Sequence, residues 1–203
     1  MTSQSPSFEG RPRRPRSRLQ FWLVLLICFA PFSAAFIVWH FELGPDARTN
    51  YGDFVDPQKP VPPFAATALE PAMPPLPSLK GKWLMLHADV AACATDCARQ
   101  LYVMRQVRAS LNEGQQRVER AWLVLDDTPV NPEVLAAYAG MNIYRVRADD
   151  WRAFLPVADG TRIEDHIYLI DPLGNLMLRW PRDVDPKEMR KDAVRLLRAS
   201  RIG

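Results

Sequence analysis

Two cysteines four positions apart, Cys93 and Cys97, are the residues best suited to chemistry in this chain of 203 residues. They stand in the stretch Cys-Ala-Thr-Asp-Cys, and the one other cysteine, Cys28, lies in a long apolar run. A thiol pair at this spacing can form a disulfide, bind a soft metal ion, or do both. Which chemistry applies depends on the elements that position the sulfurs and on the side chains around them.

The cysteines fall where a predicted strand is followed by a predicted helix. Residues 82–87 form an apolar run typical of a buried strand, and after the cysteines apolar residues recur at helical spacing as far as Asn112. The partial positive charge of a helix N-terminus stabilises a thiolate, the form that attacks disulfides and binds metals. Arg99 adds positive charge, either as a solvated residue or as a group that tunes the thiols. We therefore expect Cys93 and Cys97 to be reactive or metal-binding rather than inert.

The remaining pattern predicts one α/β domain over residues 79–203. Further strands are expected at residues 118–125, 143–146, 166–170 and 176–180, and helices that begin at Asn131-Pro132 and Asp185-Pro186. The order is then strand, helix, strand, helix, strand, strand, helix. This order predicts a thioredoxin-like domain, with a central mixed sheet flanked by helices.

Histidines are the candidates for a third metal ligand. Thioredoxin-type redox sites usually have two residues between the cysteines. The spacing here has three residues, which favours copper(I) held by two thiolates and an imidazole. His40 ends the apolar run and is set aside, and His87 could either approach the cysteines or anchor the loop. In a thioredoxin-like fold the start of the strand at His166 lies beside the first helix, so His166 is the expected ligand. Asp165 could orient its ring; alternatively, Asp165 or the backbone simply holds His166 in the fold.

Three segments precede the domain. Residues 1–20 are rich in Ser, Pro and Arg and are predicted to be a disordered basic tail. Residues 21–41 contain no charged residue and are long enough for a transmembrane helix, which needs roughly 20 residues; a cleaved signal peptide is the alternative. Residues 42–78 are rich in proline and are predicted to be a semi-rigid linker, with residues 50–52 docking onto the domain.

Charge predicts the orientation in the membrane. The first 20 residues carry five arginines and one acid, whereas the rest of the chain has 21 basic and 22 acidic residues. The positive-inside rule therefore leaves the N-terminus in the cytoplasm and the C-terminal domain in the periplasm, on an inner-membrane anchor. Outside the tail the charge is balanced, which argues against a nucleic-acid-binding surface. No nucleotide-binding loop, paired catalytic acids or Ser–His arrangement is apparent.

Over roughly residues 79–200 the chain resembles the Sco/SenC family. The resemblance rests on an anchored thioredoxin-like domain, on Cys-x-x-x-Cys after its first strand, and on a histidine before Tyr-Leu-Ile-Asp-Pro-x-Gly. The resemblance implies a divergent member that helps to assemble the copper site of cytochrome c oxidase. It implies copper(I) as the cofactor, bound by Cys93, Cys97 and His166, or reduction of the target's cysteines. The implied partner is the copper-binding subunit of the oxidase or one of its assembly factors.

The chain departs from the family pattern at the histidine. The position of the family's histidine is occupied here by Ile163, and His166 stands three residues later. An odd shift along a strand turns a side chain to the opposite face, unless a bulge or a looped start restores it. Two other functions stay open. One is a membrane-tethered thiol–disulfide oxidoreductase without a metal, in which Cys93 attacks and Cys97 resolves. The other is a non-catalytic thioredoxin-like interaction module.

Overall fold

The computed structural model of the protein describes residues 16–41, 50–200 and 202. The chain divides into two compact units, Met1–Arg48 and Thr49–Gly203. The predicted tail and the start of the predicted linker fall largely on residues 1–15 and 42–49, which lie outside the described residues.

The first unit contains one long helix, α1 (Arg16–His40). Its segment Arg18–His40 is long and apolar enough to cross a membrane, and its large apolar side chains are exposed. Pro31 lies inside the helix, which is tolerated in membrane spans. The helix fits the predicted single-pass anchor. It begins five residues before the predicted start of the span at Phe21, so residues 16–20 of the predicted tail are helical.

The second unit is built on a seven-stranded mixed sheet with the strand order β1-β7-β6-β3-β4-β5-β2. Strands β3, β4 and β5 are parallel, and β6 and β7 are antiparallel to their neighbours. The five central strands are β3 (Trp83–Asp89), β4 (Val118–Val124), β5 (Asn142–Val146), β6 (Ile167–Ile170) and β7 (Asn175–Trp180). All five were predicted to within a few residues, and the predicted thioredoxin-like fold class is confirmed.

Both edges of the sheet come from the segment predicted to be a linker. Strand β1 (Asp53–Pro60) pairs antiparallel with β7, and β2 (Ala66–Ala68) pairs antiparallel with β5. The predicted linker of residues 42–78 and the domain boundary at residue 79 are therefore wrong for the described part of that segment. Proline lacks a backbone N–H, but an edge strand can accept it because one side of the strand has no partner.

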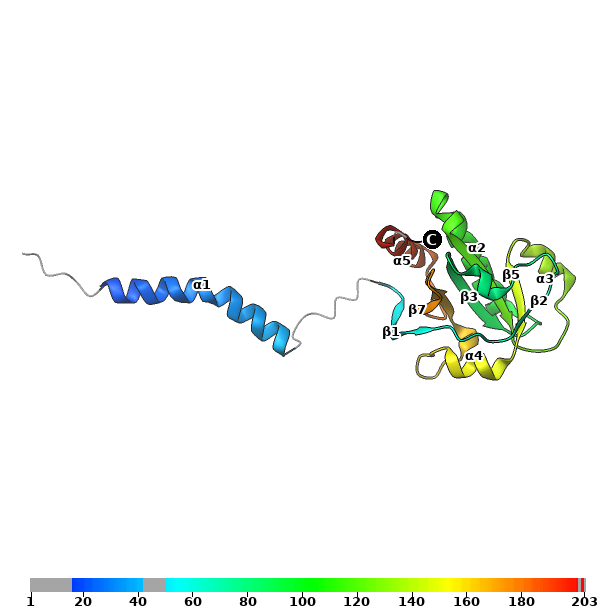
Figure 1. Ribbon diagram of the computed structural model, residues 1–203, viewed down its shortest axis with the longest axis horizontal. Coiled ribbons are helices and arrows are strands. Elements are labelled where there is room, and N and C mark those ends of the chain that lie inside the picture. Colours follow the sequence, from blue (N-terminus) through cyan, green and yellow to red (C-terminus); the bar gives the residue numbers. More distant parts are fainter. Residues whose placement is uncertain (1–15, 42–49, 201, 203) are drawn as a thin grey trace, which may run out of the picture. The chain divides into compact units, whose positions relative to one another are not determined.

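Helices cover both faces of the sheet (Figure 1). Helices α2 (Thr95–Ala109), α3 (Pro132–Ala137) and α5 (Pro186–Ala199) pack on one face, and α4 (Ala148–Phe154), which was not predicted, packs on the other. Short 3₁₀ helices are η1 (Leu76–Leu79), η2 (Asn112–Arg117) and η3 (Ile163–Asp165). The predicted helix starts are confirmed by their caps: Asn131 accepts a hydrogen bond from the N–H of Glu133, and Asp185 from that of Lys187.

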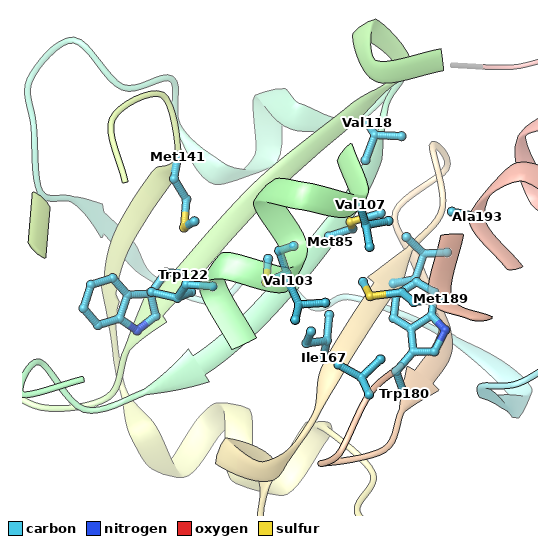
Figure 2. Close-up of a cluster of buried hydrophobic side chains, with 14 of the residues drawn as sticks. Met85, Val103, Val107, Val118, Trp122, Met141, Ile167, Trp180, Met189 and Ala193 are labelled. Carbon is cyan, nitrogen blue, oxygen red and sulfur yellow. The ribbon is translucent and has the colours of Figure 1, made fainter. Parts of the chain in front are cut away.

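Alternation along β3 divides the core into two layers. Trp83 and Met85 face α2 and α5, whereas Leu84 and Leu86 face α4. Figure 2 shows the first layer, in which side chains from the central strands meet those of the two long helices. The same alternation places His87, the one histidine of β3, on the α2 side, where the cysteines lie.

Candidate functional site

Cys93 and Cys97 form a disulfide at the start of α2. Cys93 ends the loop after β3, where its N–H donates to the carbonyl of Val90, and Cys97 lies in the first turn of the helix. Cys93 has a positive φ of 37°, a conformation uncommon outside glycine, at the point where the chain turns into the helix. The predicted pair is thus brought together by a tight loop between β3 and α2.

The helix N-terminus at this point has no side-chain cap. Ala94 occupies the N-cap position and offers no hydrogen-bond acceptor to the first-turn N–H groups. These N–H groups carry the positive end of the helix dipole, which favours a thiolate placed beside them. The local sequence therefore suits a pair of cysteines that becomes anionic when the disulfide is reduced.

The two cysteine residues differ in their exposure to solvent. Cys97 is 1% exposed and Cys93 is 8% exposed, so an incoming thiol reaches Cys93 more easily. This difference matches the predicted roles, in which Cys93 attacks and Cys97 resolves. The roles themselves stay a prediction.

The third side chain brought to this site is His87. Its ring is completely buried, and Nδ1 lies 3.0 Å from the carbonyl oxygen of His166. Because a carbonyl oxygen can only accept, Nδ1 carries a proton, and in the neutral form of the ring the lone pair is on Nε2. Nε2 is buried without a hydrogen-bond partner.

Donor atoms of His87, Asp89 and Cys97 all lie within 4.8 Å of one another. The carboxylate of Asp89 is 3.7 Å from His87 Nε2 and also accepts a hydrogen bond from the N–H of Val90. Among the residues that the structure describes, this is the one group of three or more His, Cys, Asp or Glu side chains with metal-binding spacing. Sequence reasoning left His87 open and missed Asp89, although alternation from Trp83 and Met85 indicated the correct face.

His166 is not brought to the cysteines. Its neighbours along β6 alternate so that Ile167 and Leu169 pack on the α2 side while Tyr168 and Ile170 pack on the α4 side. The His166 ring packs edge-on against Tyr168, with ring centroids 6.0 Å apart. The side chain of His166 therefore points away from the cysteine face, and Ile163, three residues earlier, also packs in the layer on the α4 side.

Both ring nitrogens of His166 are engaged where it lies. Nδ1 donates to the carbonyl of Trp180 at 2.9 Å, and Nε2 is 2.7 Å from Oγ1 of Thr161. The carboxylate of Asp165 instead accepts from the N–H of Arg162. Metal binding by His166 stays a prediction, and it would require the ring to leave these partners.

The buried position of His166 predicts a pH effect on stability. Burial lowers the pKa of His166, an effect increased by Arg179 and opposed by the Trp180 carbonyl, Asp165 and Asp53. The unfolded chain therefore takes up a proton near pH 6.5 while the folded ring stays neutral. As the pH falls below about 6.5, the free energy of unfolding should decrease, by at most about 1.4 kcal/mol per pH unit for this group.

Urea unfolding of the metal-free protein and of His166→Gln, between about pH 7.5 and about pH 5, measures this effect. The acid-side slope should be shallower in the variant, whatever its absolute stability. Equal slopes in the two proteins would contradict the prediction.

Charged residues surround the exposed side of the cysteine loop. Arg182 donates to the carboxylate of Asp96 at 2.5 Å; this hydrogen bond and the charge of Arg182 lower the pKa of Asp96, and Asp96 raises the pKa of Arg182. Arg99 pairs with Asp183 at 3.0 Å and also donates to the carbonyl of Arg182. The guanidinium of Arg99 therefore binds the loop between β7 and α5. Asp96 lies in the first turn of α2, where its negative charge would oppose a thiolate. The positive charge of Arg182 neutralises it.

Together the fold and the site define a thioredoxin-like protein with a disulfide-forming Cys-x-x-x-Cys pair at its first core helix. Residues 83–200 match the family described as transmembrane-like, thioredoxin-like, C-terminal domain. This chain therefore belongs to that family. No curated protein is significantly similar to it in sequence.

Solved structures with this fold include Sco proteins and thiol–disulfide enzymes. Yeast Sco1 with copper bound is 16% identical, with a TM-score of 0.56 over 72% of this chain and 96% of that one. Apo Sco1 from Thermus thermophilus is 19% identical, with a TM-score of 0.52 over 76% and 98%. A thiol:disulfide interchange protein from Bacteroides sp. is 14% identical, with a TM-score of 0.51 over 71% and 91%. The predicted likeness to a divergent Sco/SenC-like fold is confirmed, and these identities establish the fold alone.

Proposed function

We propose that this protein is a membrane-anchored factor whose Cys93–Cys97 pair, once reduced, binds copper(I) for assembly of the cytochrome c oxidase copper site. The observation that carries the proposal is the cysteine pair at the uncapped start of α2, beside a buried imidazole nitrogen without a partner. Two thiolates and an imidazole are soft ligands that suit copper(I). The yeast Sco1 structure of the same fold has copper bound, which supports this choice of metal.

The disulfide must be opened before copper can bind. A partner dithiol supplies the electrons: one of its thiolates attacks Sγ of Cys93, the bond between the two sulfurs breaks, and Cys97 leaves as the thiolate. The partner's second thiolate then displaces Cys93 and closes the partner's own disulfide. Copper(I) binding to Cys93 and Cys97 releases the protons that remain on their thiols.

The proposed setting is the periplasmic side of the inner membrane. The apolar helix α1 supports anchoring, and the arginines before it favour a cytoplasmic N-terminus. An oxidising compartment would also permit the observed disulfide. The proposed partner is the copper-binding subunit of cytochrome c oxidase or one of its assembly factors.

Copper stoichiometry tests the proposal. The full chain, in detergent and with Cys28→Ser to remove its third thiol, should bind one copper(I) when reduced and none above background when the disulfide is intact. Cys93→Ala and Cys97→Ala should each abolish stable binding, because two thiolates are required. Uptake no greater than that of the double cysteine variant would overturn the proposal.

A metal-free thiol–disulfide oxidoreductase is the second candidate, favoured by the unequal exposure of Cys93 and Cys97. Fast reduction of a disulfide substrate by the copper-free protein, without copper uptake, would support it.

A cell experiment tests the role in oxidase assembly. In cells that lack the protein, the oxidase should lose copper, and the wild-type chain should restore the copper content. Restoration by the double cysteine variant would instead support a non-catalytic interaction module.

A further inference from the structure

We infer that His87, through Nε2, is the third ligand of the copper(I) ion held by Cys93 and Cys97. This inference rests on the copper binding proposed above and identifies the residue that completes the site. The side chain that the sequence pattern suggested, His166, lies on the other face of the sheet. His87 lies on the same face as the cysteines, since it follows Trp83 and Met85 in the alternation along β3.

The protonation of His87 is set by the backbone. Its Nδ1 donates to the carbonyl of His166 at 3.0 Å, at the residue just before the neighbouring strand β6. A metal-bound imidazole characteristically donates its other ring N–H to a carbonyl or carboxylate, which fixes the tautomer and the ring orientation. His87 already has this arrangement, and Nε2 is the nitrogen left for a metal.

The environment of Nε2 also points to a ligand. The ring is 0% exposed, and Nε2 has no hydrogen-bond partner among the described residues. An acceptor in this position is unfavourable in the folded protein unless something binds it. Copper(I) bound to the nearby sulfur of Cys97 and to Cys93 would satisfy it.

The distances require only a small adjustment. The donor atoms of His87 and Cys97 lie within 4.8 Å of each other. In a three-coordinate site with angles of about 120°, and with bonds of about 2.0 Å to nitrogen and about 2.3 Å to sulfur, two ligand atoms lie about 3.7 Å apart. Reduction of the disulfide frees both cysteine side chains to rotate, which can supply the difference.

Asp89 is not assigned as a ligand, although its carboxylate is 3.7 Å from His87 Nε2. A carboxylate is a hard ligand that suits magnesium, calcium or manganese better than copper(I). Two thiolates on copper(I) already carry a net negative charge, which Asp89 would increase. Removing the charge of Asp89 should therefore leave copper(I) binding unchanged or strengthen it.

Competition with a chromophoric copper(I) chelator measures the affinity of the reduced full chain in detergent, with Cys28→Ser. His87→Ala should weaken binding by at least about tenfold, since even partners beyond the metal ligands contribute roughly 10–100-fold. His166→Ala and Asp89→Asn are the matched controls: the first should retain the affinity within about twofold, and the second should retain or increase it. A loss in His87→Ala no larger than the loss in either control would overturn the assignment.

A second measurement needs no substitution at His87 and is independent of folding defects. Copper(I) is diamagnetic, so nitrogen NMR of the histidine rings can follow its addition to the reduced protein. The Nε2 resonance of His87 should shift, while the ring resonances of His166 stay in place. If the protein binds copper(I) but His166 shifts or no histidine shifts, this inference fails and the proposed function stands; if no copper(I) binds, the proposed function itself fails.

Discussion

A chain that begins at residue 79 should fail to form a stable domain, whereas one that begins at Thr49 should fold. The shorter chain lacks β1 and β2, so the backbone groups of β7 and β5 that pair with them would become open edges. Long, unpaired edge strands bind other chains and promote aggregation. The loss therefore affects solubility as well as stability.

The missing segment also covers apolar side chains. Phe64 packs edge-on against Trp151 and Phe154, with ring centroids 5.4 Å and 5.8 Å apart, and the hydroxyl of Tyr144 donates to the carbonyl of Pro74. Partly buried Val55 and Val61 pack against the same layer. At about 1 kcal/mol for each half-buried side chain and 0.5–1.5 kcal/mol for each aromatic pair, the loss is roughly 4 kcal/mol or more. A typical domain is stable by only about 5–15 kcal/mol.

Circular dichroism melts and size-exclusion chromatography of the two proteins test this prediction. The longer protein should elute as a single species and unfold cooperatively. The shorter one should aggregate or melt at a temperature lower by at least about 10 °C. Equal melting temperatures would show that the two edge strands contribute little to the fold.

Periodicity explains which elements could be predicted. Strands β3 and β6 are nearly continuous buried runs, β7 alternates buried and partly buried residues, and α2 and α5 repeat apolar residues at helical spacing, so each of these elements has a pattern of its own. Strands β1 and β2 contain only exposed or partly buried residues, and β1 has two prolines, Pro57 and Pro60. Their place is set by the free edges of β7 and β5. Helix α4 has seven residues and one buried side chain, Trp151, which is too few for a periodic pattern.

The site shows the same division between local and long-range information. The cysteine pair and its helix could be placed from spacing alone. The choice between His87 and His166 depended on whether a bulge precedes β6, and a bulge is a property of strand pairing rather than of local sequence. The backbone of η3 leads into β6 in an extended conformation, so the side chain of His166 faces α4 while its carbonyl faces His87.

Replacing Asp192 by alanine should cause the largest loss of stability of any single carboxylate substitution discussed for this protein. Asp192 lies in α5, is 1% exposed, and accepts three hydrogen bonds. The donors are the N–H groups of Tyr51 and Gly52, at 3.1 Å and 2.9 Å, and the indole Nε1 of Trp180, at 3.0 Å. The carboxylate thus ties β7 and the residues before β1 to the last helix, which confirms the expected docking of residues 50–52.

Alanine at position 192 would leave these donors without an acceptor in a place that water cannot easily enter. Gly52 is already crowded, since an added Cβ would lie 2.7 Å from Leu178 and 2.8 Å from Trp180, so the segment has little room to find other partners. Hydrogen bonds to a charged group contribute roughly 1.5–3 kcal/mol each, and losses at one residue are not fully additive. We expect the free energy of unfolding to decrease by about 3–5 kcal/mol.

Thermal and urea unfolding of the full chain in detergent measure the effect, with Asp183→Ala as the matched control. The side chain of Asp183 is 88% exposed and pairs with Arg99 at the surface, where an ion pair contributes only about 0–1 kcal/mol. The Asp192→Ala protein should melt well below both the wild type and the control. A loss no larger than that of Asp183→Ala would mean that the three donors find new partners, and that Asp192 does not hold the β1 edge to α5.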